Sequence, residues 1–254
     1  MLSAITAALA VGMVVGGPVA GGPGTTQALD TAGEQGSGSG RLETAADSGG
    51  GPAMTVLPGR TLEREPEPEP VPVPESASGT FSIAGVSGSS GTRPDDAGLR
   101  LTSYRVEVEE GLPFDADAVA DEVESILSDE RGWVTRGHLL VREDGDADLR
   151  ILLASPTTAD RLCAPLLTRG RLSCRNGGNV VLNAWRWQFG ADGYAGELAA
   201  YRRYVINHET GHALGYPHVG CPGPGEIAPV MLQQTKGLEG CKPNPWPSRV
   251  DLVH

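Results

Sequence analysis

The stretch NHETGHALGYPHVGC, residues 207–221, holds most of the side chains in this sequence that could bind a transition metal. The chain has 5 histidines, and His208, His212 and His218 all fall here, beside Glu209. In a chain of this composition, the pattern H-E-x-x-H-x-x-G-x-x-H is expected by chance on the order of 10⁻⁵ times. Imidazole nitrogen is a preferred zinc ligand, so the stretch predicts a site for one zinc ion.

The spacing within this stretch favours a catalytic zinc site over a structural one. His208 and His212 have helical i, i+4 spacing, which places both imidazoles on one face. Gly215 can end that helix, and the chain can then return His218 to the same ion. Three imidazoles leave a fourth zinc position for water, whose pKa the metal lowers. Glu209 is then expected to accept the proton of that water as a general base.

The remaining histidines carry no comparable signal. His138 opens a predicted strand and His254 is the last residue, so we expect each to be solvated or packed rather than chemically active.

Charge and cysteine content limit the classes of partner and the compartment. The chain has 32 acidic against 20 basic residues, a net charge of −12, with no basic run, which argues against nucleic-acid binding. It has 4 cysteines and no C-x-x-C pair, a pattern typical of two disulfides in an exported protein. Proximity in sequence favours the pairs Cys163–Cys174 and Cys221–Cys241, although three pairings are formally possible.

Composition divides the chain into an apolar start, a linker and one domain. Residues 1–20 carry no charged side chain and are expected to be a cleaved signal peptide or a membrane anchor; either places the domain outside the cytoplasm. Residues 21–80 are rich in Gly, Pro, Ser and Glu and lack aromatic residues, so we expect a disordered linker. The composition of residues 81–254 is that of a compact domain.

Hydrophobic periodicity predicts an α+β domain in which helices pack on a mixed sheet. One hairpin is expected, with its turn at Asn176-Gly177-Gly178. Its second strand is expected to carry Trp185 and Trp187 onto one sheet face, where both side chains pack. The alternative is that the two tryptophans form a platform that binds a carbohydrate or a peptide. The expected strands are residues 101–110, 138–143 and 147–155, the hairpin is 171–187, and the helices are 115–129 and 196–215.

The motif HETGHALGYPH resembles the long zinc signature of the metzincin metallopeptidases. Those enzymes also have a methionine turn beneath the metal, and APVMLQQT, residues 228–235, is similar to it. The stretches RLSCRNGGNVVLNAWRW, YRRYVINHETGHALG, CPGPGEIAPVMLQQT and NPWP resemble a family of secreted, metzincin-like bacterial proteins that has no assigned function. This resemblance covers roughly residues 81–250.

The resemblance implies a metzincin-like fold, with a mixed twisted sheet, an active-site helix and an irregular C-terminal subdomain. It also implies that His208, His212 and His218 are zinc ligands, that Glu209 is the base and that Met231 forms the turn. Some metzincins have a tyrosine two residues after the turn methionine, where this chain has Gln233. This leaves three alternatives for this position: Gln233 contacts substrate, Gln234 contacts substrate, or neither does.

These observations together predict a secreted or membrane-tethered zinc-dependent endopeptidase that acts on a peptide or protein substrate. The expected protein is monomeric and touches a membrane only through residues 1–20, if these are not cleaved. One alternative is a zinc amidase that acts on cell-envelope peptides or small amides. Another is a non-catalytic envelope protein that zinc stabilises, although a structural site would need no base such as Glu209.

Overall fold

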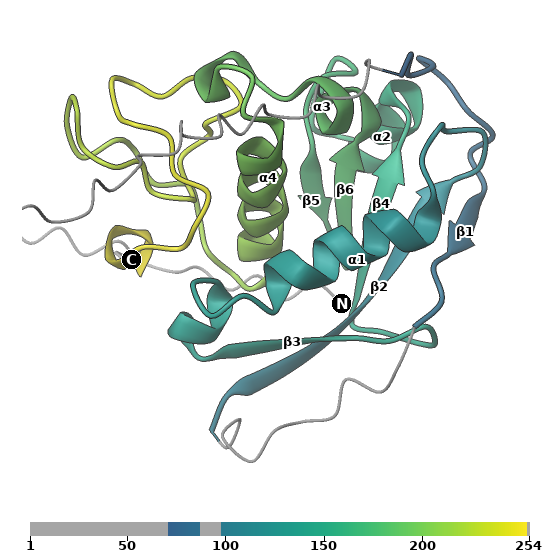
Figure 1. The fold of residues 1–254 in the computed structure, drawn as a ribbon, viewed down its shortest axis with the longest axis horizontal. Coiled ribbons are helices and arrows are strands. Elements are labelled where there is room, and N and C mark those ends of the chain that lie inside the picture. The colour runs from purple at the N-terminus through teal and green to yellow at the C-terminus, as the bar shows by residue number, and fades with distance from the viewer. Residues whose placement is uncertain (1–70, 87–97, 253–254) are drawn as a thin grey trace, which may run out of the picture. The chain divides into compact units, whose positions relative to one another are not determined.

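A computed structural model describes residues 71–86 and 98–252 of the chain (Figure 1). The predicted signal peptide or anchor at residues 1–20, the predicted linker as far as residue 70, and His254 lie outside the described residues. Within the described ranges, no helix combines the length and the apolar character that a membrane crossing needs.

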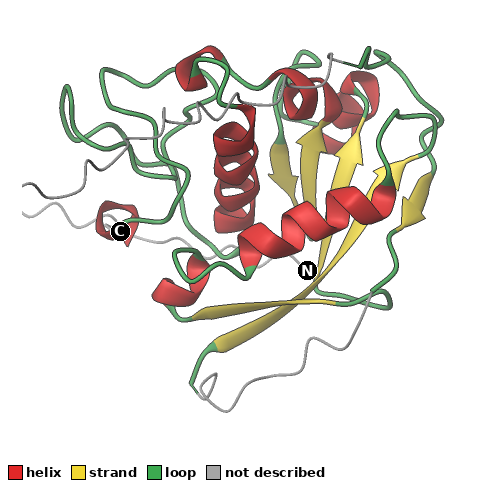
Figure 2. Cartoon of the chain, viewed as in Figure 1, coloured by secondary structure: helices red, strands yellow, loops and turns green. Residues whose placement is uncertain are grey.

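The described domain is built on a mixed, six-stranded sheet (Figure 2). The strand order is β1-β2-β4-β6-β5, and β3 also pairs with β2. β3, β2, β4 and β6 run parallel to one another, whereas β1 is antiparallel to β2 and β5 is antiparallel to β6. The strands are β1 (Phe81–Ile83), β2 (Arg100–Glu109), β3 (His138–Arg142), β4 (Leu149–Ala154), β5 (Cys174–Asn176) and β6 (Asn179–Asn183).

Helices cover both faces of the two central strands, β4 and β6. Alternate residues such as Ile151 and Val180 join one apolar cluster with α1 and α4, while Leu152 and Val181 join a second cluster with α2. Residues 151–154 of β4 and 180–182 of β6 are therefore continuously apolar, as strands buried on both faces of a sheet usually are. The helices are α1 (Ala116–Leu127), α2 (Pro156–Cys163), α3 (Ala184–Phe189) and α4 (Leu198–Ala213), and short 3₁₀ helices span Trp133–Arg136, Asp192–Tyr194 and Arg249–Leu252.

The α+β class, the mixed sheet and most of the expected elements are confirmed. The predicted helices at 115–129 and 196–215 correspond to α1 and α4, and the Asp115 side chain caps α1 by accepting from the Ala118 amide at 2.9 Å. From residue 214 to residue 248 the chain forms neither helix nor strand and makes only an isolated bridge between Ile227 and Lys242.

The predicted hairpin is right at its turn and wrong at its end. β5 and β6 meet at Gly177-Gly178 as expected, but the chain leaves the sheet at Asn183 and enters α3. The Asn183 side chain causes this change, because it accepts from the Trp185 amide at 3.0 Å and so caps the helix. Trp187 is buried in the main core, whereas Trp185 is half-buried against Phe189, so the two tryptophans do not share a sheet face.

The domain begins earlier than the predicted boundary at residue 81. Glu75, assigned by sequence to the linker, forms an ion pair of 2.7 Å with Arg171, and Gly79 donates its amide to Glu109 at 2.8 Å. Glu109 is only 1% exposed and also accepts from the Ser155 amide at 2.6 Å. Its buried carboxylate needs these donors, which explains why a proline-rich segment without an apolar core of its own is held in place.

Both disulfides predicted from sequence proximity are present. Cys163 is bonded to Cys174, and Cys221 is bonded to Cys241. Disulfides persist in oxidising compartments, so they suggest an extracellular location for this domain.

Candidate metal centre

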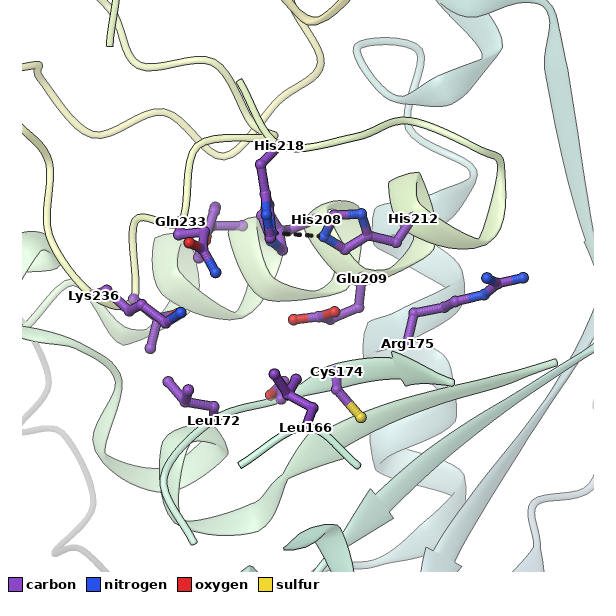
Figure 3. A pocket seen from close by; sticks show the side chains of 13 residues that line it. Leu166, Leu172, Cys174, Arg175, His208, Glu209, His212, His218, Gln233 and Lys236 are labelled. Atoms are coloured by element: carbon purple, nitrogen blue, oxygen red, sulfur yellow. Dashed lines mark hydrogen bonds between the residues drawn. The ribbon is translucent and has the colours of Figure 1, made fainter. Parts of the chain in front are cut away.

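Helix α4 and the loop that follows it bring together the three histidines singled out by sequence. His208 and His212 lie one turn apart on α4, and His218 returns from the loop above them (Figure 3). One potential ligand atom from each of the three lies within 4.8 Å of the others. Residues Tyr204 to Gly211 are all buried, so this part of α4 lies inside the domain rather than on its surface.

Backbone carbonyl groups fix the orientation of the two helical imidazoles. His208 Nδ1 donates to the Val230 carbonyl at 2.8 Å, and His212 Nδ1 donates to the Tyr216 carbonyl at 2.8 Å. A carbonyl can only accept, so each Nδ1 carries the proton and each Nε2 has a lone pair available for a metal.

The donor set fits a zinc ion. His212 Nε2 lies 3.0 Å from His218 Nε2, and zinc–nitrogen bonds of about 2.0–2.1 Å place tetrahedral ligand nitrogens roughly 3.3 Å apart. Burial lowers the pKa of His208 to about 3, and burial also lowers the pKa values of His212 and His218. All three imidazoles are therefore neutral near pH 7, which is the form that binds metal.

Glu209 lies beside the three imidazoles without joining them. It is 6% exposed, and its carboxylate points away from His218 into the cavity, towards β5 (Figure 3). Burial raises the pKa of Glu209 to about 8, partly offset by the positive charge of Lys236. A raised pKa makes the ionised carboxylate a stronger base, and the positive charge of a metal held by the three imidazoles would favour that ionised form.

Met231 lies beneath α4, against the turn of helix between Glu209 and His212. Met231 is fully buried, its amide donates to Asp251 Oδ1 at 2.9 Å, and its carbonyl accepts from the Val219 amide at 3.1 Å. The residue before it, Val230, orients His208 as described above. The Met231 loop therefore connects one candidate ligand directly with the loop that carries His218.

A second contact group supports the loop after α4. The Trp133 ring packs on Tyr216, with 4.7 Å between centroids, and Trp133 Nε1 donates to the Asn207 carbonyl at 3.1 Å. The Tyr216 hydroxyl lies 3.2 Å from His138 Nε2. Of the two expected environments for His138, solvated or packed, the structure shows the packed one, since the residue is buried and shares a hydrogen bond with this loop.

A cavity of about 310 Å³ opens beside the histidines and Glu209. Its opposite wall is the segment that leads into β5, and the loop after Met231 closes one end (Figure 3). Only part of the lining is identifiable from the sequence, because the other contributors carry no metal-ligand or general-base signal and several of them are distant from α4 in the chain. These additional lining residues are Leu166, Leu172, Ser173, Arg175, Tyr204, Thr235 and Lys236.

The two glutamines after Met231 have different environments. Gln234 is fully buried, accepts from the Tyr194 hydroxyl at 2.9 Å, and donates to the Asn244 carbonyl at 2.8 Å. Gln233 is half-buried and lines the cavity close to His218 (Figure 3). Of the two, only Gln233 is therefore placed to meet a ligand.

The disulfides brace the walls of the site and supply no candidate ligand. Cys221–Cys241 closes the loop that contains Met231, and Cys163–Cys174 joins α2 to β5. Cys174 also lines the cavity.

One family model, described as "Protein of unknown function (DUF3152)", matches residues 67–246. The matched region contains the candidate metal centre and the whole cavity lining. It begins ahead of residue 71, in agreement with the docking of residues 71–80 on the domain. The comparisons with curated proteins and with solved structures gave no match.

Proposed function

The chain belongs to the DUF3152 family, and we propose that it is a zinc-dependent peptide-bond hydrolase of the metzincin type. One observation carries the proposal: a single cavity contains three neutral, convergent imidazoles and a buried carboxylate that does not converge with them. A purely structural metal site would have no need of that carboxylate.

His208, His212 and His218 would hold the metal, and their orientation is set before it arrives. The Val230 and Tyr216 carbonyl groups fix the two helical rings, which lowers the cost of arranging the ligands. A zinc ion bound there would act as a Lewis acid and lower the pKa of water.

Glu209 performs the proton transfers in this proposal. Its carboxylate accepts one proton as water attacks the peptide carbonyl carbon, and then delivers it to the amine nitrogen as the C–N bond breaks. The products are a carboxylic acid and an amine, so atoms and charge balance. Burial supports the first transfer, because a raised pKa favours accepting a proton, and the cavity keeps the carboxyl group near the reacting bond for the second.

The edge position of β5 supports a peptide as the substrate. Within the described residues, β5 pairs with β6 on one side and has no strand on its other side. Ser173, Cys174 and Arg175 of this region line the cavity across from Glu209. An extended peptide could add to this edge through backbone hydrogen bonds, which would hold a backbone carbonyl near Glu209.

Digestion of a diverse peptide library tests the proposal. The purified protein, loaded with one equivalent of zinc, should cleave internal peptide bonds, and removing the metal with a chelator should abolish cleavage until zinc is restored. A zinc-loaded protein that leaves the library intact but hydrolyses small amides would contradict the peptidase proposal and favour an amidase.

A further inference from the structure

Two cationic side chains line the cavity at opposite ends, with Glu209 between them. Arg175 belongs to β5, and Lys236 lies in the loop after Met231 (Figure 3). The two come from separate parts of the chain, so their placement on one cavity is a property of the fold. Leu166 and Leu172 form an apolar wall between them.

Neither cation is in an ion pair with the described residues, although the charge of Lys236 acts on the Glu209 carboxylate. Arg105, Arg142, Arg150, Arg171 and Arg202 each form an ion pair with a carboxylate. Among the described residues, no carboxylate pairs with Arg175 or with Lys236.

The cavity therefore differs in charge from the chain as a whole. Among the described residues that line it, Glu209 is the only acidic one, and it is buried. The chain carries a net charge of −12, yet this cavity presents two exposed cations. The net negative charge of the chain opposes an anionic ligand at long range, whereas the two cations attract it locally.

We infer that the cavity selects acidic peptides, which place one carboxylate against Lys236 and another against Arg175, on either side of the bond that faces Glu209. This inference rests on the proposed function and specifies its substrate class. Exposed ion pairs are screened and individually weak, so each carboxylate is expected to improve affinity by about two- to fivefold at moderate salt. Both together should contribute about tenfold.

Binding to the zinc-loaded Glu209→Gln protein tests the inference separately from catalysis. Three fluorescent peptides share a leucine centre and differ only at the flanking positions, which carry glutamate, glutamine or lysine. The glutamate peptide should bind about tenfold more tightly than the glutamine peptide, and the lysine peptide should bind most weakly. High salt should reduce these differences.

Variants in the same Glu209→Gln background assign the effect to the two cations. Lys236→Ala and Arg175→Ala should each lose about two- to fivefold of the preference for glutamate, and the double variant should lose all of it. Lys236→Glu should favour lysine at one flanking position only. Lys242→Ala makes the same charge change as Lys236→Ala outside the cavity lining and should leave the preference unchanged.

The outcomes separate this inference from the proposed function. Equal binding of the three peptides, no binding of any of them, or a glutamate preference that survives in the double variant would overturn the inference. If the wild-type protein cleaves peptides without enrichment of acidic residues, the peptidase proposal stands and the acidic selectivity fails. If the glutamate peptide binds selectively but the wild-type protein cleaves none of the three, the selectivity stands and the peptidase proposal fails.

Discussion

Gly211 lies so close to Met231 that a Cβ atom on Gly211 would stand 2.5 Å from the Met231 sulfur. The same Cβ would stand 2.6 Å from the Trp133 ring. The glycine between Glu209 and His212 therefore lets Met231 and Trp133 pack directly on the part of α4 that carries the candidate ligands. This contact explains a glycine inside a helix, where it normally costs about 1 kcal/mol relative to alanine.

Gly211→Ala should therefore destabilise the domain although alanine favours helices. Overpacking of a filled core costs about 1–3 kcal/mol, and the displaced turn should also reduce zinc affinity. Denaturant unfolding and a zinc competition titration measure the two effects. Gly145→Ala is the matched control, because a Cβ there meets nothing within 4 Å. A Gly211→Ala protein as stable as the control would show that the contact has no energetic role.

Gln233 and Gln234 form a matched pair for separating substrate contact from structure. Gln234→Ala should lower the free energy of unfolding by roughly 2–3 kcal/mol, because the buried partners of its amide lose their hydrogen bonds. Gln233→Ala should change stability by less than about 0.5 kcal/mol but lower kcat/KM on peptides by about tenfold. If the Gln233→Ala protein keeps the wild-type kcat/KM, Gln233 makes no energetically important contact with the substrate.

Loss of the Cys221–Cys241 bond should weaken zinc retention although neither cysteine is a candidate ligand. This bond closes a loop with a sequence separation of 20 that contains Met231, and crosslinks of this size contribute about 3 kcal/mol. The paired Cys221→Ser and Cys241→Ser protein should be less stable and should release zinc to a chelator faster. The protein with Cys163→Ser and Cys174→Ser should also be less stable than wild type, but it should release zinc more slowly than the protein that lacks the Cys221–Cys241 bond. Equal zinc release from both proteins would argue against a specific role for the Met231 loop.

Glu107, which lies outside the candidate metal centre, is expected to make a pH-dependent contribution to the free energy of unfolding. Burial raises its pKa, but hydrogen bonds from Arg150 and Arg105 outweigh this effect and leave the pKa below the ordinary value. The folded state therefore binds this proton less readily than the unfolded state. The contribution is fully present above the ordinary glutamate pKa of about 4.3 and is lost as the pH falls through the lower folded value.

Glu107→Gln should cost roughly 2 kcal/mol in unfolding free energy at pH 7, because the carboxylate accepts from Arg150 Nε at 2.6 Å and from Arg105 Nε at 2.8 Å. The difference from wild type should shrink as the pH falls below about 4. Denaturant unfolding across this pH range measures it. Glu143→Gln, at an exposed residue, should show little effect at any pH. A deficit in Glu107→Gln that stays constant with pH would contradict the account.

The part of the site within α4 was accessible from sequence because helical periodicity is local. His208, Glu209 and His212 have fixed positions relative to one another as soon as the helix forms. Arg175 and Lys236 were not identified, because their proximity depends on how β5 and the loop after Met231 are placed by the whole domain.

Two errors in the predicted fold have identifiable physical causes, one local in sequence and one long-range. Trp185 and Trp187 alternate with Arg186 as strand residues do, but the Asn183 cap starts a helix at that point. Residues 71–80 have a linker composition, yet the ion pair of Glu75 and the hydrogen bond of Gly79 with Glu109 fix them on the domain. Neither long-range contact is visible in composition.

The most direct test of the central claim measures zinc content and peptide hydrolysis on one preparation of Glu209→Gln. The amide keeps the shape of the side chain but cannot accept a proton, and general-base loss typically lowers the rate by about 10² to 10⁴. The account predicts wild-type zinc content with hydrolysis reduced by this factor, while Glu226→Gln, outside the cavity lining, behaves as wild type. A Glu209→Gln protein that retains its zinc and cleaves peptides at the wild-type rate would contradict the account.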